Sequence, residues 1–465
     1  MKTKIIASLF LISLLNAGCK KGLDLLPTDS VTEEVAFNSV AALQKGLNTV
    51  YTRYSGARVN TAYANSITSD ETKFGPDNGG SGQFGYRLQY TSSTNSNPEV
   101  TDMFVNYYAA IDMANRVLAA SEKVSVAGAL EENQRNTIRG ELLALRGMSH
   151  FELLEAYSKS YDPANPLGVP VVLVSCVDCE PARNTVSEVI TQVEKDINDA
   201  KALLPTGTLG TYNDLALNQL SVTAYQARIA LYKREWQKAS DLATIIITSG
   251  VKPLVSGNAF AGIWTDQNTN EVLFRSRFEN NSFVGAQWTQ TNGSIIFSPS
   301  DKLTATYNAN DIRSSVYIGT SSRGRFVKKF SLSSRGGSIV DFKNIRTAEM
   351  YLIRAEAKAE LNDLAGAAAD INSLRTQRIT GYTPITYADK ATAITDIILE
   401  RYRELAFEGF RFYDLKRRGL PLQRQASDVD SPLWQTLAVG DYRFVYPIPG
   451  NELLANRQMV QNPGY

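Results

Sequence analysis

The chain has 465 residues, of which 43% are apolar and 20% charged, and its 48 lysines and arginines nearly balance 47 aspartates and glutamates. This composition predicts a globular protein with a large core and excludes intrinsic disorder, while a net charge of +1 gives no reason to expect nucleic acid as a partner. Three cysteines and one histidine argue against a disulfide scaffold and a multi-histidine metal site.

The N-terminus has the pattern of an export signal. A short basic start and an apolar run over residues 5–15 precede Asn16-Ala-Gly-Cys19, and residues 1–18 are predicted to be a signal peptide. A cysteine directly after Ala-Gly resembles the bacterial lipobox, although Asn16 stands where leucine is usual. We expect lipid attachment at Cys19; ordinary secretion with a free Cys19 thiol is the alternative. No later run reaches the length of a membrane-spanning helix.

Helical periodicity dominates the rest of the chain, and the predicted class is mostly α. Apolar residues recur at i, i+3 and i+4 in nine stretches, which cover residues 34–57, 102–118, 131–157, 187–204, 214–234, 236–249, 347–361, 364–378 and 391–408. Strand-like runs are few, for example 271–278 and 442–448.

Two helix pairs repeat one pattern. Ala227 precedes Trp236 by nine residues and Ala239 by twelve, and Ala355 precedes Leu364 and Ala367 by the same intervals. Small residues let paired helices approach closely, as in tetratricopeptide-type hairpins. The sequence therefore predicts a scaffold of helical hairpins, with a loop-rich subdomain inserted on one side.

Two insertions are rich in glycine, aromatic and polar residues: residues 60–100 and 252–346. Sugar-binding sites combine aromatic platforms with a few placed polar groups, and both insertions contain that combination. The alternative is that the aromatics form small cores of the loops themselves. The predicted ligand-binding residues are Phe74, Asp77, Asn78, Phe84, Tyr86, Trp264, Phe283 and Trp288.

The remaining reactive residues give no catalytic signature. Cys176 and Cys179 predict a short-range disulfide or two idle thiols, since zinc would need two further ligands. His150 lies in a helical stretch and is expected to be a packed histidine. No hydrolase, metalloprotease or phosphate-loop motif occurs. Composition alone does not test for the pair of carboxylates that glycoside hydrolysis needs. We expect a protein that is not an enzyme and has no cofactor or metal.

The segment 399–419 carries many charges. Three i, i+3 ion pairs are expected to stabilise a helical face there: Glu400–Arg403, Glu408–Arg411 and Asp414–Arg417. We interpret the segment as a buttress that packs on the loop-rich part rather than as a ligand site, and the run 416–418 as solvated.

The same segment, Leu399-Glu-Arg-Tyr-Arg-Glu-Leu-Ala-Phe-Glu-Gly-Phe-Arg-Phe-Tyr-Asp-Leu-Lys-Arg-Arg-Gly419, resembles the signature of the SusD/RagB family of outer-membrane nutrient-binding lipoproteins. Three other stretches are similar to that family in the same order. They are residues 345–357, the ending 446–452 with 461–465, and the start 19–28.

The resemblance implies a non-enzymatic lipoprotein of the outer membrane, exposed at the surface, that captures oligosaccharides for a partner TonB-dependent transporter. A peptide receptor, or a lid whose main role is docking the transporter, are the alternatives. It also implies two halves, 19–250 and 251–465, the second comprising the loop-rich 252–346, helices over 347–419 and a tail. The residues after Cys19 lack the early acidic run that often marks surface display, which leaves the periplasmic face as an alternative.

Overall fold

Helices make up most of the computed structural model, which describes residues 33–93, 98–279, 283–336 and 339–465. The helices are α2 (Glu33–Ala36), α3 (Val40–Thr68), α4 (Gln83–Tyr86), α5 (Pro98–Ser121), α6 (Ala129–Tyr157), α7 (Val186–Leu203), α8 (Gln219–Lys233), α9 (Trp236–Ser249), α10 (Gly257–Trp264), α11 (Phe283–Ala286), α12 (Asp301–Thr304), α13 (Arg313–Val316), α14 (Thr347–Glu360), α15 (Leu364–Thr376), α16 (Lys390–Glu404), α17 (Arg411–Arg418) and α18 (Gly450–Ala455). Within those residues, no helix combines the length and the apolar character that a membrane span requires.

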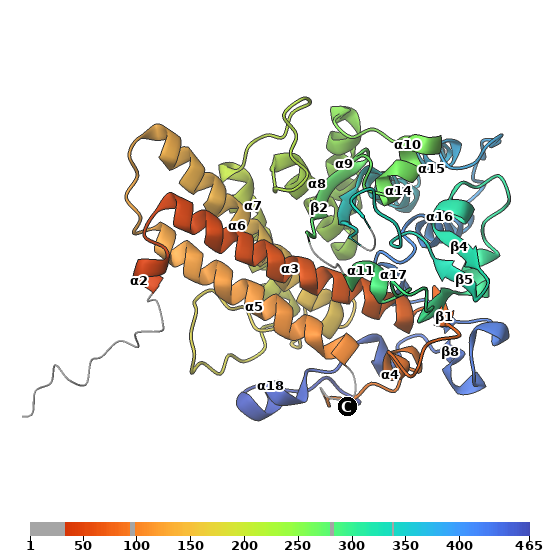
Figure 1. The fold of residues 1–465 in the computed structure, drawn as a ribbon, viewed down its shortest axis with the longest axis horizontal. Coiled ribbons are helices and arrows are strands. Elements are labelled where there is room, and N and C mark those ends of the chain that lie inside the picture. The colour runs from red at the N-terminus through yellow and green to blue at the C-terminus, as the bar shows by residue number, and fades with distance from the viewer. Residues whose placement is uncertain (1–32, 94–97, 280–282, 337–338) are drawn as a thin grey trace, which may run out of the picture.

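The strands are short and pair two by two. They are β1 (Thr72–Phe74), β2 (Val272–Ser276), β3 (Phe297–Pro299), β4 (Ile318–Ser321), β5 (Gly324–Val327), β6 (Phe342–Arg346), β7 (Leu422–Gln423) and β8 (Thr436–Leu437). The antiparallel pairs are β1–β3, β2–β6, β4–β5 and β7–β8. Figure 1 shows the long helices α3, α5 and α6 running along one side, whereas β1, β4 and β5 lie together at the other end.

All nine predicted helices are confirmed, but several ends differ. The helix predicted over 214–234 begins at Gln219, and the one predicted over 391–408 ends at Glu404. The helix predicted over 34–57 is α3, which continues to Thr68 after a brief start at α2. The first insertion therefore begins at residue 69, and the prediction of a loop from residue 60 was wrong. The strand predicted at 271–278 is β2, but the run at 442–448 forms a 3-10 turn over Tyr442–Phe444 instead of a strand.

Side-chain caps explain where several helices begin. The Thr185 hydroxyl accepts a hydrogen bond from the Glu188 backbone N–H, and the Glu188 carboxylate accepts one from the Thr185 N–H, at the start of α7. Asn218 and Ser221 form the same reciprocal box before α8. Each cap satisfies backbone donors that a helix start leaves unpaired.

The two repeated helix pairs have the same turn. Arg234 and Asn362 both adopt the left-handed conformation, with φ of 62° and 66°. The next residue in each copy donates its backbone N–H to a carbonyl five residues earlier, at 2.9 Å in the first pair and 2.8 Å in the second. The alanines that defined the pattern are fully buried in the structure: Ala227, Ala239, Ala355 and Ala367. The helical-hairpin prediction is confirmed at both places.

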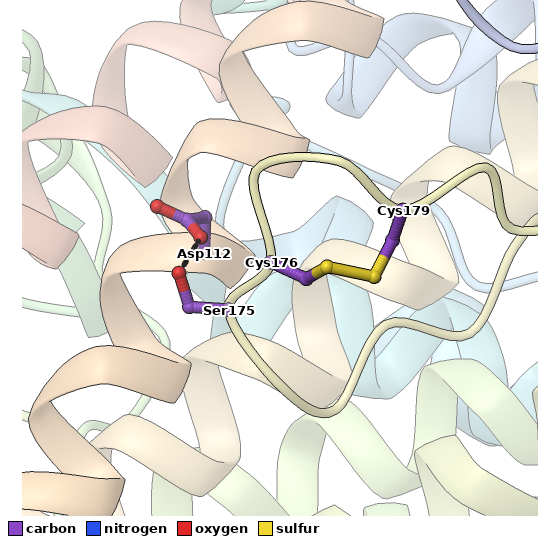
Figure 2. The surroundings of a disulfide bond; sticks show 4 residues. All are labelled: Asp112, Ser175, Cys176 and Cys179. Carbon is purple, nitrogen blue, oxygen red and sulfur yellow. Dashed lines mark hydrogen bonds between the residues drawn. A yellow bond between two sulfur atoms is a disulfide. The ribbon is translucent and has the colours of Figure 1, made fainter. Parts of the chain in front are cut away.

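The loop after α6 is closed by a disulfide between Cys176 and Cys179. Figure 2 shows this loop beside a helix, where the Ser175 hydroxyl donates to the Asp112 carboxylate at 2.6 Å. The predicted short-range disulfide is therefore present. His150 is fully buried, and its Nε2 accepts the backbone N–H of Val172 at 3.1 Å, so it is a packed histidine as expected.

Segment 399–419 contributes to a buried ion-pair cluster. The cluster consists of Glu271, Asp311, Arg313, Lys329, Arg346, Arg375, Arg378, Glu400, Glu404 and Glu408, none of them more than 6% exposed. At its centre the Glu404 carboxylate accepts hydrogen bonds from Arg346 and Arg378, at 2.9 and 3.0 Å. Arg346 ends β6 in the loop-rich part, and Arg378 lies just after α15. The cluster therefore joins segment 399–419 to the loop-rich part, as the predicted buttress does.

Two expectations for this segment were wrong. The pairs Glu400–Arg403 and Asp414–Arg417 form, at 3.4 and 2.7 Å. Glu408 and Arg411 do not pair, because α16 ends at Glu404 and the chain turns between them: Glu408 binds Arg346 and Lys329, and Arg411 binds Asp70. The run at 416–418 is largely buried rather than solvated, since Arg417 is held by Glu356 and Asp414.

Candidate functional site

The two insertions meet at the pairing of β1 with β3. Phe74 lies opposite Phe297 in this register, and the next residue, Gly75, donates its backbone N–H to the Ile296 carbonyl at 2.9 Å. A side chain at residue 75 would place its Cβ 2.1 Å from the Ile295 carbonyl oxygen, so glycine is required for this close approach. The two insertions, which the sequence analysis treated separately, are thus joined at this pairing.

Asp77 and Asn78 fix the loop that follows β1. The Asp77 carboxylate accepts the backbone N–H of Ile295 at 2.9 Å and binds Arg323 at 2.7 Å. The Ile295 N–H, followed by Arg323, lowers the pKa of this carboxyl below its ordinary value, so Asp77 is anionic at neutral pH. Asn78 donates its amide to the Ile296 carbonyl at 3.0 Å. Both side chains therefore hold the loop, and Asp77 also remains partly exposed.

An aromatic group lies behind this loop. The ring of Phe74 packs 4.3 Å from Tyr86 and 5.7 Å from Phe297, measured between centroids. Tyr86 is fully buried, and its burial raises the pKa of the hydroxyl to about 12. Phe84, on the same short helix α4, is 37% exposed. The helix thus has one aromatic ring in the core and one at the surface.

The two predicted tryptophans are core residues. Trp288 is 2% exposed and contacts Tyr63 at 5.4 Å. Trp264 is also 2% exposed, with the Lys329 ammonium 4.2 Å and the Arg346 guanidinium 5.0 Å from its ring. These rings face protein groups, which agrees with the alternative that the loops have small cores of their own. Their role in ligand binding stays a prediction.

The structure adds charged side chains that the sequence did not single out. Arg87 lies 5.5 Å from the Phe74 ring and pairs with Asp430 at 2.7 Å. Arg323 is 52% exposed and comes from the β4–β5 hairpin. Nothing in their local sequence marks them, because they reach the region only through the β1–β3 pairing and the fold of the C-terminal tail. We define the loop face as Phe74, Asp77, Phe84, Arg87 and Arg323.

The remaining predicted residues are placed as follows. Phe283 begins α11, but its side chain lies outside the described part of the structure, as does Cys19. Within the described ranges, no group of three or more histidine, cysteine or acidic residues could hold a metal ion.

Two cavities are lined by other residues. One of about 670 Å³ lies beside the C-terminal tail, and one of about 560 Å³ lies between α3, α6 and the segment before α8. Tyr51 and Glu141 meet in the smaller cavity, where the tyrosine hydroxyl donates to the carboxylate. Burial raises the pKa of Glu141 to about 7. None of the predicted ligand-binding residues lines either cavity.

Comparison with known proteins extends over most of the chain. A family model described as "SusD family" matches residues 276–465, and one described as "Starch-binding associating with outer membrane" matches residues 21–231. SusD-like protein P2 of Formosa agariphila is 24% identical over the whole of both chains.

Two further relatives give the same result. The starch-binding protein SusD of Bacteroides thetaiotaomicron is 29% identical over 34% of this chain and 31% of its own. The crystal structure of a putative sugar binding protein from Bacteroides vulgatus aligns with a TM-score of 0.79 at 26% identity, covering 92% of this chain and 99% of that one. The mostly helical class and the resemblance noted in the sequence are both confirmed, and the chain is a SusD homologue.

Proposed function

We propose that this protein binds oligosaccharides on the loop face and delivers them to an outer-membrane transporter. The observation that supports it most directly is the convergence of two insertions into one surface with an exposed ring and fixed polar groups. Relatives are named for starch or sugar binding, and one matching family model is described by starch binding and outer-membrane association. The role assigned here is binding, not catalysis.

The chemistry of the loop face suits a sugar. The C–H faces of a pyranose ring pack on an aromatic ring, which the exposed Phe84 offers. Asp77 accepts hydrogen bonds from sugar hydroxyls, and the Arg323 guanidinium has donors beyond the one that binds Asp77. Asp77 is paired with Arg323, and Arg87 with Asp430, so the face has no unpaired charge that would select an ionic ligand.

We propose further that Cys19 carries the lipid anchor, that the bound sugar passes to a TonB-dependent transporter, and that the protein faces the cell exterior. Acyl chains at one end hold a water-soluble body on a membrane, provided that more than one chain is attached. The motif before Cys19 supports this proposal. Mass spectrometry of the mature N-terminus tests it: an acylated Cys19 supports anchoring, and an unmodified cysteine or a different first residue overturns it.

Calorimetric titration of the purified protein with neutral and acidic oligosaccharides, and with a tryptic peptide digest, tests the binding function. The informative variant is Phe84→Ala, because its ring is exposed and its loss leaves the core intact. Tyr351→Ala, at a half-buried tyrosine on α14 away from the loop face, is the matched control. Loss of sugar binding in the first variant and not in the second supports capture on this face.

The other outcomes decide between the alternatives. Binding of peptides without any sugar would make the protein a peptide receptor of the same family. If the protein binds neither sugars nor peptides but associates stably with the transporter, its main role would be to dock on the transporter as a lid. Sugar binding that Phe84→Ala leaves unchanged would move the site away from the loop face.

A further inference from the structure

The larger cavity lies away from the loop face, at the C-terminal tail. Its volume is about 670 Å³, and three segments enclose it: residues 159–167 after α6, the C-terminal end of α17, and the tail residues 440–445 with 462–463. We call it the tail cavity. Pockets of this size hold small organic ligands when apolar walls are combined with a few polar groups.

One wall is a tyrosine ring held in place from behind. Tyr442 is 44% exposed, and its ring packs edge-on against Tyr465 with 5.0 Å between centroids. Gly464 lies directly on the ring: a Cβ there would come within 2.4 Å of it, and the φ of this residue is 103°. The backbone before the ring is fixed by Asp441, which accepts two hydrogen bonds from the Arg443 guanidinium at 3.0 and 2.8 Å.

The other walls are apolar and ordered. Tyr161, on the segment after α6, packs edge-on against Tyr232 at 5.6 Å. Phe444 is 4% exposed and stacks on Phe412 at 5.1 Å. Leu420, after α17, completes the lining on that side. A ligand in the cavity would therefore meet two tyrosines from different segments, together with the apolar side chains of Phe444 and Leu420.

Polar groups remain available at the cavity. Within the described ranges, the hydroxyls of Tyr161 and Tyr442 and the ammonium of Lys159 make no hydrogen bond or ion pair to another residue. Asp162 uses one carboxylate oxygen to accept the Ala164 N–H at 3.0 Å. The cavity thus offers two hydroxyls, one amine and one carboxylate, with no excess of either charge.

We propose that the tail cavity is a second carbohydrate-binding site. This inference rests on the proposed function, because it assigns the same class of ligand to a separate place. A sugar has apolar C–H faces and many hydroxyls, which matches apolar aromatic walls edged by uncommitted hydroxyl, amine and carboxylate groups. An anionic or cationic small ligand would find like and opposite charges in equal number, because Lys159 and Lys416 line the cavity together with Asp162 and Asp441.

Aromatic contacts also connect the cavity wall to the segment after α4. Tyr90, six residues after Phe84, has its ring 6.3 Å from Tyr465, which in turn contacts Tyr442. The Tyr90 hydroxyl also donates to the Arg443 carbonyl. Figure 1 shows the C-terminus beside α4, in agreement with these contacts. A row of tyrosine rings therefore leads from Tyr90, four residues after the end of α4, to the cavity.

The test is calorimetric titration of the full-length protein with maltoheptaose and with laminarihexaose, using tryptic casein peptides as a second class. Tyr442→Ala removes the platform, and Lys159→Ala removes an exposed donor whose loss does not disturb folding. Phe84→Ala reports on the loop face, and Tyr351→Ala is the matched control. Thermal melting of each variant checks that it folds.

In Tyr442→Ala, we expect the affinity for at least one oligosaccharide to fall at least about tenfold, or the number of binding sites to fall by one. In Lys159→Ala, we expect a smaller but measurable loss of affinity. If both tail variants bind every sugar as the wild type does while Phe84→Ala loses binding, the second site is overturned and the proposed function stands. If the wild type binds no sugar, both are overturned. If casein peptides bind the wild type and only the tail variants lose that binding, the ligand of the cavity is a peptide and not a carbohydrate.

Discussion

Removing the central carboxylate of the ion-pair cluster, in Glu404→Ala, is expected to destabilise the fold strongly. Burial raises the pKa of Glu404, but the guanidinium groups of Arg378, Arg346 and Arg313 outweigh it and hold the pKa well below its usual range. The carboxylate is therefore charged throughout the working pH range. The five basic and five acidic side chains of the cluster balance each other, and the substitution leaves one buried positive charge without a partner.

The magnitude follows from burial. Glu404 is 0% exposed and contacts Arg313, Arg346 and Arg378 at 3.1, 2.9 and 3.0 Å. Breaking a fully buried pair by removing one partner costs about 3–5 kcal/mol. The entropy of unfolding near 60 °C is about 2.1 cal/mol/K per residue, or about 1 kcal/mol/K for 465 residues. The melting temperature should therefore fall by about 3–5 °C.

Thermal melting and urea denaturation, each followed by circular dichroism, measure this change. Arg403→Ala is the control, because Arg403 makes one longer contact of 3.4 Å to Glu400 and is 20% exposed. We expect that control to cost about 1 kcal/mol or less. A Glu404→Ala protein no less stable than Arg403→Ala would refute the argument that the cluster must stay neutral in the interior.

Four further outcomes are expected. Phe84→Ala should weaken oligosaccharide binding about tenfold without changing the melting temperature, since its ring is exposed. Gly75→Ala should destabilise by about 1–3 kcal/mol in urea denaturation, because its Cβ would collide with the Ile295 carbonyl. Burial raises the pKa of the Glu71 carboxyl to about 8 from its usual 4.5, so the folded state holds this proton more tightly than the unfolded state does. The free energy of unfolding should therefore fall as pH rises from about 4.5 to 8. Thermal melts across this pH range should show a flatter slope for Glu71→Gln. The Cys176–Cys179 disulfide closes a very short loop, so its reduction by dithiothreitol should cost about 2 kcal/mol or less.

Sequence periodicity predicted the helices well because it measures a local property. An amphipathic face at i, i+3 and i+4 is the same whether the partner helix is near or far in sequence, so α7 and α9 were predicted to within a residue. The first insertion was misplaced because α3 continues through Thr61, Asn65 and Thr68, whose polar side chains are buried and satisfied inside the protein. A polar residue inside a core breaks the pattern that predicts a helix.

The candidate site was harder to predict because it is made by long-range pairing. Phe74 and Phe297 are brought together only by the β1–β3 register, and Asp77 meets Arg323 across the same junction. The predicted pair Glu408–Arg411 failed for a related reason. Spacing of i, i+3 implies contact only inside a continuous helix, and the helix ends at Glu404, four residues before Glu408. Instead, Glu408 pairs with Arg346 and Lys329, and Arg411 pairs with Asp70, all far away in sequence.

Burial of the predicted tryptophans changes how the loop face should be understood. Trp288 packs between Tyr63 and Phe407, and Arg346, which binds Glu404, lies against Trp264. The two tryptophan rings therefore lie in the interior, and Trp264 contacts the ion-pair cluster. The smaller ring of Phe84 and the Asp77 carboxylate are partly exposed to solvent. The proposed site, held in this way, would keep its geometry before ligand arrives, which would reduce the entropy lost on binding. Sugar selectivity should then depend on the exposed residues, and loss of a buried tryptophan should lower stability and binding together.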